Sequence, residues 1–390
     1  MKYLVYIQTF GCQMNKLDSE LIANVLVEKG YKLADSEESA DIILLNACSV
    51  RAHAEERVYN RLSLLSRLKK SKPNLILGLV GCMAQKDKEL AFKRLPQLNL
   101  VCGPHRYKTL VNLINEAQTK KKHINCTDQA GLLSDENPER TNQAVPPDKH
   151  SYIQAMRGCD NYCSYCIVPY VRGKEVSRPI RDIVTETNSL VSRGINAITL
   201  LGQNITAYGV KRNPAGWRDG HNMTSGKSQI SLSILLRELH SIDNLNHIGF
   251  ITGHPAFVTV QLLETMATLP KIRRELHMPA QSGSDRILKL MNRGYTAQEY
   301  LNITKEAHRL MPDIKIISDF IVGFPAETDD DFSATVDLVK TAEFSKIFVF
   351  KYSSRPGTAA AKMPDDVPLS VKKERNNILL DVQKKIHNLR

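Results

Sequence analysis

The sequence of 390 residues contains no run of about 18 apolar residues, which excludes a membrane-spanning helix. Its first residues, MKYLVYIQTFGC, lack the apolar block and small-residue cleavage site of a signal peptide, so we expect a cytoplasmic protein. The sequence also has no G-x-S-x-G nucleophile elbow and no phosphate-binding P-loop. The usual signatures of serine hydrolases and P-loop nucleotidases are therefore missing.

Acidic residues are fewer than basic ones. The chain has 53 Lys and Arg against 41 Asp and Glu, which gives a formal net charge of +12 and a pI near 9.2. A basic balance fits a polyanionic partner such as a nucleic acid. It fits equally a basic surface without such a partner, so charge alone leaves both interpretations open.

Cysteine, in contrast, is well represented. Eight cysteines lie at positions 12, 48, 82, 102, 126, 159, 163 and 166. In a secreted protein an even number would suggest disulfides. In a chain without an export signal, metal binding or catalysis is the better expectation.

The first part of the chain alternates strand-like and helix-like patterns. Apolar runs typical of strands cover 3–9, 41–47, 75–80 and 98–102. Helical patterns lie between and after them, at 18–29, 53–70, 87–94 and 107–116, and Gly30 is a natural end for the first helix. This alternation predicts a doubly wound α/β domain with a parallel sheet.

A second alternation begins near residue 151. Its strand-like segments are 152–156, 197–201, 247–252, 275–277, 314–319 and 346–351, with helical segments between them. Six such units predict a partial TIM-like (βα)6 barrel. We expect four regions: the N-terminal α/β domain at 1–118, a polar linker at 119–144, the barrel at 145–377, and a basic C-terminal helix at 378–390. Residues 209–229 are rich in turn-forming residues and predict a surface loop.

The strongest motif is the C-x3-C-x2-C run of Cys159, Cys163 and Cys166, directly after the expected strand at 152–156. Three thiolates in one tight loop can hold three irons of a cubane cluster and leave the fourth iron open. A structural zinc site needs four protein ligands, and an electron-transfer cubane normally has four cysteines. The loop lies at the carboxyl edge of the barrel, where barrel enzymes build their active sites. We interpret it as an iron–sulfur site, with a structural thiol loop as the alternative.

A second set of cysteines follows the first three strands: Cys12, Cys48 and Cys82. The carboxyl ends of parallel strands meet at one edge of a sheet, so these thiols should converge. Three buried structural cysteines are the alternative, but their equivalent positions favour a second cluster. Cys102 also ends a strand, and we favour a packed thiol over a fourth ligand. Cys126 is expected to be structural or incidental.

Polar residues follow the later strands of the barrel. Gln203 and Asn204 follow the second strand, His254 the third and Gln281 the fourth, while Ser318 lies in the fifth. Each alone is more often a turn or helix-cap residue. Together they surround one mouth of the barrel, so we predict that they contact the cofactor.

Several long motifs resemble those of the radical S-adenosylmethionine (SAM) methylthiotransferases. They are TFGCQMN (9–15), RGCDNYCSYCIVPYVRGKEVSRP (157–179), LLGQN (200–204), HMPAQSGSDRIL (277–288), SDFIVGFPAET (318–328) and YSSRPGTAA (352–360). The resemblance covers nearly the whole chain. The Gln13-Met14-Asn15 run is similar to the branch of that family that acts on tRNA.

The resemblance implies two 4Fe–4S clusters. Cys159, Cys163 and Cys166 would bind the cluster that cleaves S-adenosyl-L-methionine, and Cys12, Cys48 and Cys82 an auxiliary cluster involved in sulfur insertion. Cys102 and Cys126 match no family motif. The family's usual Thr-Ser-His-Pro is Thr-Gly-His-Pro at 252–255 here, so we expect no role for a side chain at 253.

The resemblance further implies methylthiolation of C2 of N6-isopentenyladenosine at position 37 of tRNA, next to the anticodon. This C–H bond is not acidic, so radical chemistry supplied by a cofactor is needed. The implied partners are the anticodon stem-loop of tRNA, SAM and an electron donor of the flavodoxin or ferredoxin type. The family's small RNA-binding β-barrel would begin about where this sequence stops, at Arg390.

Three alternatives remain at this point. The chain could modify threonylcarbamoyladenosine in tRNA, or an aspartate of a ribosomal protein, as other branches of the family do. It could also be a non-enzymatic iron–sulfur or zinc protein that binds RNA. Iron and sulfide analysis would separate this last alternative from the enzymes, because two cubanes require about eight irons per chain.

Overall fold

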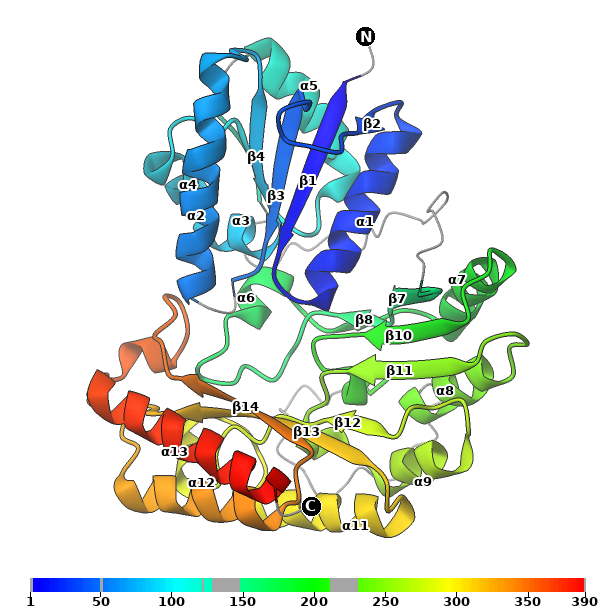
Figure 1. Cartoon of the computed structure of the whole chain (residues 1–390), viewed down its shortest axis with the longest axis vertical. Helices are drawn as coiled ribbons and strands as arrows, with labels where there is room; N and C mark the ends of the chain where they lie inside the picture. Colours follow the sequence, from blue (N-terminus) through cyan, green and yellow to red (C-terminus); the bar gives the residue numbers. More distant parts are fainter. Residues whose placement is uncertain (1–2, 50–51, 121–122, 128–147, 211–230, 389–390) are drawn as a thin grey trace. The chain divides into compact units, whose positions relative to one another are not determined.

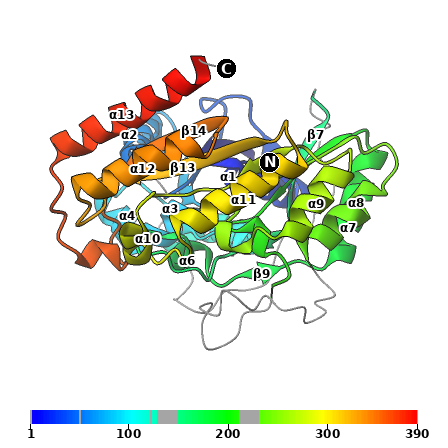
Figure 2. The ribbon, with the colours of Figure 1, turned by 90° about the horizontal axis from the view of Figure 1, so that it is seen from below.

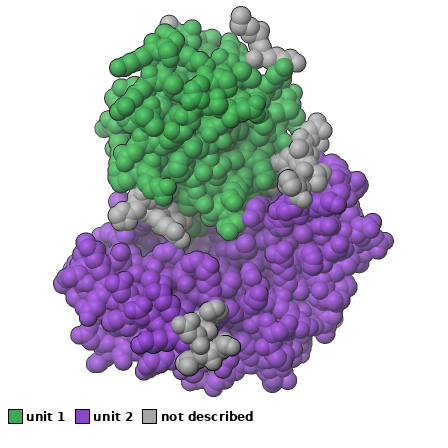
Figure 3. Space-filling view, viewed as in Figure 1, with its two compact units in different colours: residues 1–144, 167–174 green, residues 145–166, 175–390 purple. Residues whose placement is uncertain are grey.

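The structure is a computed structural model that describes residues 3–49, 52–120, 123–127, 148–210 and 231–388. The chain divides into two compact units, coloured separately in Figure 3. Unit 1 contains residues 1–144 and 167–174, and unit 2 contains residues 145–166 and 175–390. In the described part of the chain, no helix combines the length and apolarity needed to cross a membrane.

Unit 1 is built on one six-stranded parallel sheet with the strand order β2-β1-β3-β4-β5-β6. Its strands are β1 (Leu4–Phe10), β2 (Lys32–Leu33), β3 (Ile42–Ala47), β4 (Ile76–Val80), β5 (Leu100–Cys102) and β6 (Ile124–Cys126). Its principal helices are α1 (Gln13–Glu28), α2 (Ala52–Ser66), α3 (Cys82–Asp87), α4 (Glu89–Arg94) and α5 (Leu110–Lys120). The continuous apolar runs of the central strands are typical of a sheet that is covered on both faces.

Two separate hydrophobic cores cover the two faces of this sheet. One core joins α1 and α5 to strand residues such as Ile42 and Leu44, and the other joins α2, α3 and α4 to Ile43 and Leu45. Alternate residues of one strand thus enter opposite cores, as the pleat requires. Figure 1 shows α1 and α2 on the two sides of the sheet. The predicted doubly wound domain is confirmed.

Unit 2 contains six parallel strands in chain order, arranged as two groups of three. They are β7 (His150–Gln154), β10 (Ala197–Leu201), β11 (His247–Ile251), β12 (Glu275–His277), β13 (Lys315–Val322) and β14 (Lys346–Lys351). A parallel bridge between Ile248 and Ile272 and a hydrogen bond from the Gly253 amide to the His277 carbonyl connect β11 to β12. The predicted partial (βα)6 barrel is therefore confirmed.

Helices cover the outside of these strands. They are α7 (Ile180–Ser192), α8 (Leu232–His240), α9 (Val260–Thr268), α10 (Asp285–Leu290), α11 (Ala297–Leu310), α12 (Asp329–Thr341) and α13 (Leu369–Asn388). Figure 2 shows α7, α8, α9, α11 and α12 following one another beside the strands. One large core of aliphatic and aromatic side chains fills the space between helices and strands.

Some boundaries differ from those expected. Strand β6 lies within the segment predicted to be a linker (119–144). It was not predicted, because a strand of three residues between polar flanks gives little periodic signal. Helix α13 begins at Leu369, well before the expected start at residue 378. Most of the linker and of the loop predicted at 209–229 lies outside the described residues.

One short segment of the later sequence belongs to unit 1. Residues 167–174 directly follow Cys166 and contain helix α6 (Val168–Arg172). The side chains of Ile167 and Val171 form a small apolar cluster with Cys82. The sequence pattern did not predict this packing, because a helix of five residues is too short to show amphipathic periodicity.

Candidate functional site

Unit 1 brings three predicted cysteines to the carboxyl edge of its sheet. Cys12 is the N-cap residue of α1, Cys48 directly follows β3, and Cys82 is the first residue of α3. Cys12 and Cys48 are hydrogen-bonded neighbours, and Cys12 lies close enough to Cys82 to influence its ionisation. Cys48 and Cys82 are buried, whereas Cys12 is exposed.

Two glycines allow the backbone to pass close to these thiols. A Cβ on Gly11 would lie 2.5 Å from the Cβ of Cys48, and a Cβ on Gly81 would lie 2.3 Å from Oδ1 of Asn46. Both glycines also have positive φ angles, +150° and +90°. Asn15 and Asn46 are fully buried and hydrogen-bonded to each other at 3.0 Å. This buried amide pair was not predicted, although Asn15 stands in the TFGCQMN motif.

Two of these thiols, Cys12 and Cys82, have pKa values shifted in opposite directions. The hydrogen bond with Cys48 lowers the pKa of Cys12 to about 6, and Arg172 and the backbone amides at the start of α1 act in the same direction. Burial raises the pKa of Cys82 to about 11, although the guanidinium of Arg172 opposes this rise. Metal binding requires thiolates, so a bound metal would have to displace the proton of Cys82.

Arg172 of α6 is a buried cation beside these cysteines. Its Nε donates to Sγ of Cys82 at 2.9 Å, and its Nη1 and Nη2 donate to the carboxylate of Asp18 at 3.3 and 2.5 Å. The hydroxyl of Tyr107 donates to the same carboxylate at 3.3 Å. All of these side chains belong to unit 1.

The two remaining cysteines of unit 1 lie side by side on β5 and β6. Cys102 is fully buried in the core under α1 and α5, and Cys126 is half-buried at the edge of the same core. The Cys126 thiol lies 3.8 Å from the hydroxyl of Thr109. Their surroundings are those of packed thiols, as the sequence predicted.

Unit 2 holds the C-x3-C-x2-C loop after β7 and the short strand β8 (Met156–Arg157). The loop is fixed through its backbone: the Ser164 amide donates to the Met291 carbonyl, and the Ala360 amide donates to the Ser164 carbonyl. The side chain of Asn292 donates to the carbonyls of Asn161 and Tyr162 at 3.1 and 3.2 Å. Met291, Asn292 and Ala360 therefore shape the cysteine loop, a role that spacing alone did not reveal.

Arg293 is a second buried cation beside a cysteine. Its Nη1 donates to Sγ of Cys163 at 3.3 Å, its Nη2 to the Pro279 carbonyl at 2.7 Å, and its Nε to the Tyr295 hydroxyl at 3.0 Å. These partners carry no formal charge while Cys163 is protonated. A buried cation needs an anionic partner, and an anionic iron–sulfur cluster on this loop would supply one.

The residues predicted at the barrel mouth are nearly all buried. Oε1 of Gln203 and Nδ2 of Asn204 are buried polar atoms without a hydrogen-bond partner among the described residues. The backbone amide of His254 is held by the Thr206 hydroxyl at 2.9 Å, and the His254 ring packs edge-on against Tyr295. Unpartnered buried polar atoms at a strand end are suited to bind a polar ligand.

Three loops at the same mouth each contain a non-glycine residue with a left-handed backbone. Thr252, Gln281 and Ala326 have positive φ angles of 73°, 70° and 66°, each in the loop that follows β11, β12 or β13. Such angles are uncommon for residues other than glycine and cluster at functional sites. Ser318, in contrast, uses its hydroxyl inside the fold: it accepts from the Ala280 amide at 2.9 Å and donates to the Met278 carbonyl at 3.1 Å. Ser318 therefore supports the loop that carries Gln281.

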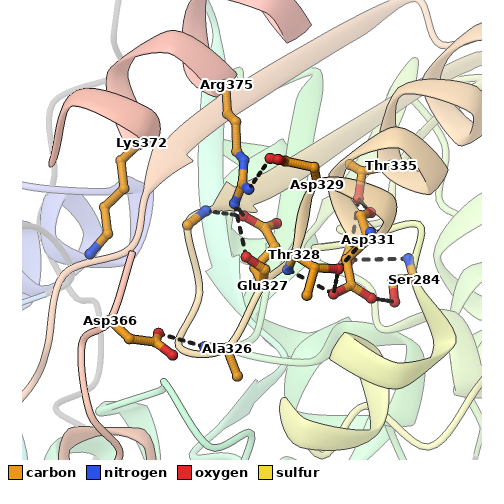
Figure 4. A network of polar contacts seen from close by, with 12 residues as sticks. Ser284, Ala326, Glu327, Thr328, Asp329, Asp331, Thr335, Asp366, Lys372 and Arg375 are labelled. Atoms are coloured by element: carbon orange, nitrogen blue, oxygen red, sulfur yellow. Dashed lines mark hydrogen bonds and ion pairs between the residues drawn. The ribbon is translucent and has the colours of Figure 1, made fainter. Parts of the chain in front are cut away.

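A network of charged groups supports the loop after β13 (Figure 4). Arg375 of α13 donates to Glu327 at 2.8 Å and to Asp329 at 2.7 Å. Asp331 accepts hydrogen bonds from Ser284 at 2.6 Å and from the backbone amide of Thr328 at 2.8 Å. These bonds fix the position of the SDFIVGFPAET motif. They also provide partners for the buried carboxylates of Glu327 and Asp331.

The donor sets of the two cysteine sites suit iron–sulfur clusters better than other metals. Each site offers three thiols, and thiolates are the usual ligands of such clusters. Among the described residues, no three His, Cys, Asp or Glu side chains have the spacing of a site for a single metal ion. The case for clusters therefore depends on the three thiols of each site and, in unit 2, on the buried cation Arg293, which can balance an anionic cluster.

Comparisons with known families and proteins agree with this architecture. Residues 4–103 match the Uncharacterized protein family UPF0004, and residues 153–339 match the Radical SAM superfamily. A protein of Syntrophotalea carbinolica named tRNA-2-methylthio-N(6)-dimethylallyladenosine synthase is 39% identical over 98% of this chain and 84% of its own length. A protein of Nitrosomonas eutropha with the same name is 42% identical over 99% of this chain and 83% of its own length.

Solved structures with a similar fold are more distant in sequence. The radical S-adenosylmethionine methyltransferase TsrM from Kitasatospora setae matches with a TM-score of 0.63 at 13% identity, over 92% of this chain and 74% of that one. The cobalamin-dependent S-adenosylmethionine radical enzyme OxsB matches with a TM-score of 0.55 at 14% identity, over 99% of this chain and 56% of that one. At such identities the similarity concerns the fold alone.

Proposed function

Since the chain belongs to the family of radical SAM enzymes named tRNA-2-methylthio-N(6)-dimethylallyladenosine synthase, we propose that it methylthiolates C2 of N6-isopentenyladenosine next to the anticodon of tRNA. The observation that carries this proposal is an identity of about 40% to these relatives over nearly the whole chain. It favours this substrate over threonylcarbamoyladenosine, over a ribosomal protein and over a non-enzymatic role. The chain is thus a transferase that requires SAM and a 4Fe–4S cluster.

Cys159, Cys163 and Cys166 would hold the cluster that reacts with SAM. When bound, that cluster supplies the electron that splits the sulfonium of SAM. The chain's own residues orient the reactants: the backbone bonds at Ser164 fix the loop, and Arg293 balances negative charge beside Cys163. Gln203, Asn204, His254 and Gln281 surround the mouth as candidate contacts to SAM, and Ser318 supports the loop of Gln281 from inside β13.

Cys12, Cys48 and Cys82 would hold a second 4Fe–4S cluster in unit 1. Their convergence at one sheet edge supports this assignment. Three protein ligands leave one iron free to carry the sulfur that is transferred. Cys102 and Cys126 pack in the core instead and are not assigned to the cluster.

The proposed substrate also fits the chain's charge. A net charge of +12 attracts the tRNA backbone. An anticodon loop can present an unstacked base to a pocket, which a duplex cannot. The remaining inferred partner is an electron donor of the flavodoxin or ferredoxin type, and the tRNA substrate implies a cytoplasmic location.

The experiment begins with anaerobic purification and reconstitution of the whole chain. Wild type should contain about eight irons per chain, from two clusters of four. Cys163→Ala should abolish SAM cleavage, because it removes a ligand of the first cluster. Cys48→Ala should retain SAM cleavage but produce no methylthiolated tRNA. Cys126→Ala is the matched control, since this half-buried thiol is outside both sites, and it should behave as wild type.

The products should be identified by mass spectrometry of nucleosides from isopentenylated tRNA. Methylthio product made by Cys48→Ala would show that the auxiliary site is wrongly assigned. Product formed on threonylcarbamoyladenosine but not on isopentenyladenosine would contradict the proposed substrate.

A further inference from the structure

Arg172 makes contacts that the proposed reaction does not by itself require. Its guanidinium is almost fully buried in unit 1, and its three nitrogens are all engaged: Nε with the sulfur of Cys82, and the other two with the carboxylate of Asp18. Asp18 is also buried, and it additionally accepts a hydrogen bond from Tyr107. The orientation of Arg172 is therefore fixed by three bonds from two different elements.

Stability alone does not explain why this ion pair is buried here. Removing two charges from water costs several kcal/mol per ion, and buried pairs are often no better than well-packed apolar residues of the same size. Apolar neighbours are available at this place, because Ile167 and Val171 of the same helix already pack on Cys82. A guanidinium aimed at a cysteine sulfur thus has a local electrostatic effect that an apolar side chain would lack.

That effect is predictable from the chemistry of iron–sulfur clusters. Hydrogen bonds to the sulfurs and the net charge nearby set the reduction potential. A donated N–H and a positive charge stabilise the more negative, reduced cluster and so raise its potential. Asp18 acts in the opposite direction, because its carboxylate neutralises the guanidinium that faces Cys82.

We propose that Arg172 is a positioning residue for the auxiliary cluster: it donates a hydrogen bond to the Cys82 ligand and, with Asp18, sets the reduction potential of that cluster. The inference rests on the proposed second cluster. The sequence of the chain adds a further consequence. Arg172 lies six residues after Cys166, so the loop that carries the first cluster continues directly into the segment that adjusts the second.

The test uses the full chain with Cys159, Cys163 and Cys166 all replaced by Ala, so that any remaining cluster is the auxiliary one. Arg172→Gln, Arg172→Lys and Asp18→Asn are introduced into this parent. Each protein is reconstituted anaerobically, its iron content is measured, and the midpoint potential is obtained by a redox titration followed by electron paramagnetic resonance. Arg293→Gln is the matched control, because it removes a buried arginine of unit 2 that has no contact with the cysteines of unit 1 among its hydrogen bonds.

Opposite shifts are expected for the two partners. Arg172→Gln should lower the midpoint potential, because the positive charge and its N–H donor are lost. Asp18→Asn should raise it, because the guanidinium is no longer neutralised. Arg172→Lys should give a value between parent and Arg172→Gln, since Lys keeps the charge but not the planar geometry. Arg293→Gln should leave the potential unchanged.

Shifts of the same sign, or no shift in clusters that load fully, would overturn the proposal and leave Arg172 a structural residue. If Arg172→Gln does not retain its cluster, the Asp18→Asn variant tests the proposal instead. A midpoint potential above that of the parent supports the proposal, and an unchanged midpoint potential refutes it. A parent variant that binds no cluster at all would overturn the proposed auxiliary site itself and, with it, this inference.

Discussion

At the scale of single residues, the cysteine site of unit 1 requires glycine at positions where a side chain would not fit. Gly81 lies where any side chain would overlap Asn46, and its backbone has a left-handed φ of +90°. Asn46 in turn donates to the Asn15 carbonyl at 2.8 Å and thereby fixes the start of α1 beside Cys12. The positions of the thiols are thus determined by two glycines and two amides as much as by the cysteines.

Gly81→Ala should destabilise unit 1 by about 2–5 kcal/mol, because the left-handed backbone costs about 1–2 kcal/mol and overpacking adds about 1–3 kcal/mol. Gly30→Ala is the control: its φ is +88°, but nothing lies within 4 Å of the added Cβ. It should cost only about 1–2 kcal/mol. Urea unfolding, with hydrogen exchange to assign the transition to unit 1, measures both. Equal losses would show that the contact with Asn46 is unimportant.

At the scale of elements, one buried carboxylate of unit 2 connects the starts of two helices. Helix α12 begins with a reciprocal capping box in which the Thr328 hydroxyl binds the Asp331 amide and the Asp331 carboxylate binds the Thr328 amide. Ser284 and Arg286 contact the same carboxylate. One acidic residue therefore joins the start of α12 to the start of α10.

Asp331 should make stability depend on pH. Burial opposes its ionisation, but hydrogen bonds from Arg286, Ser284 and Thr328 outweigh burial and hold its pKa below the usual range. The carboxylate therefore stabilises the fold above about pH 4 and loses this effect as the pH falls below that value. Asp331→Asn should cost about 1–2 kcal/mol at pH 7, and the difference from wild type should shrink towards pH 3.

Urea unfolding of the cluster-free chain between pH 3 and 7 measures this dependence. Asp330→Asn is the control, because Asp330 occupies the same first turn but is exposed. A difference between Asp331→Asn and wild type that stays constant with pH would contradict the assignment.

The same loop is attached to the C-terminal helix by Arg375. Arg375→Met should destabilise unit 2 by about 3–5 kcal/mol, because the fully buried Glu327 would lose its charged partner. Lys384→Met on the same helix is the control, since Lys384 and Asp381 are both exposed. It should change stability by less than about 0.5 kcal/mol. Adding Glu327→Gln to Arg375→Met should recover part of the loss, and no recovery would argue against an electrostatic cause.

The elements also show what the sequence could predict and why. Strands followed from apolar runs, and the converging positions of Cys12, Cys48 and Cys82 followed from the rule that parallel strands end at one edge. The contacts of Arg172 and Arg293 could not be predicted, because Asp18 and Arg172 are 154 residues apart and no periodic pattern connects them. The early start of α1 was missed because its N-cap, Cys12, makes no side-chain capping bond.

At the scale of the whole molecule, charge is the property that bears on the substrate. The chain has a net charge of +12, so its contacts to tRNA phosphates should release counterions from the RNA. This gain becomes smaller as the salt concentration rises, so the affinity for tRNA should fall. If about three phosphates are contacted, raising the salt from about 50 to 200 mM should weaken binding by about 20-fold. Fluorescence anisotropy with an anticodon stem-loop measures this slope. An affinity independent of salt would show that the basic surface does not contact the RNA backbone.

The return of residues 167–174 to unit 1 has a consequence for any attempt to divide or recombine this enzyme. A fragment that ends at residue 144 would lack the short helix that covers Cys82 and neutralises Asp18. A chimera that takes residues 1–144 from one relative and the rest from another would therefore combine parts of unit 1 from two proteins. Residues 167–174 should be exchanged together with residues 1–144. Part of unit 1 is encoded within the stretch of sequence that otherwise forms unit 2, so a cut at residue 144 does not separate the two units.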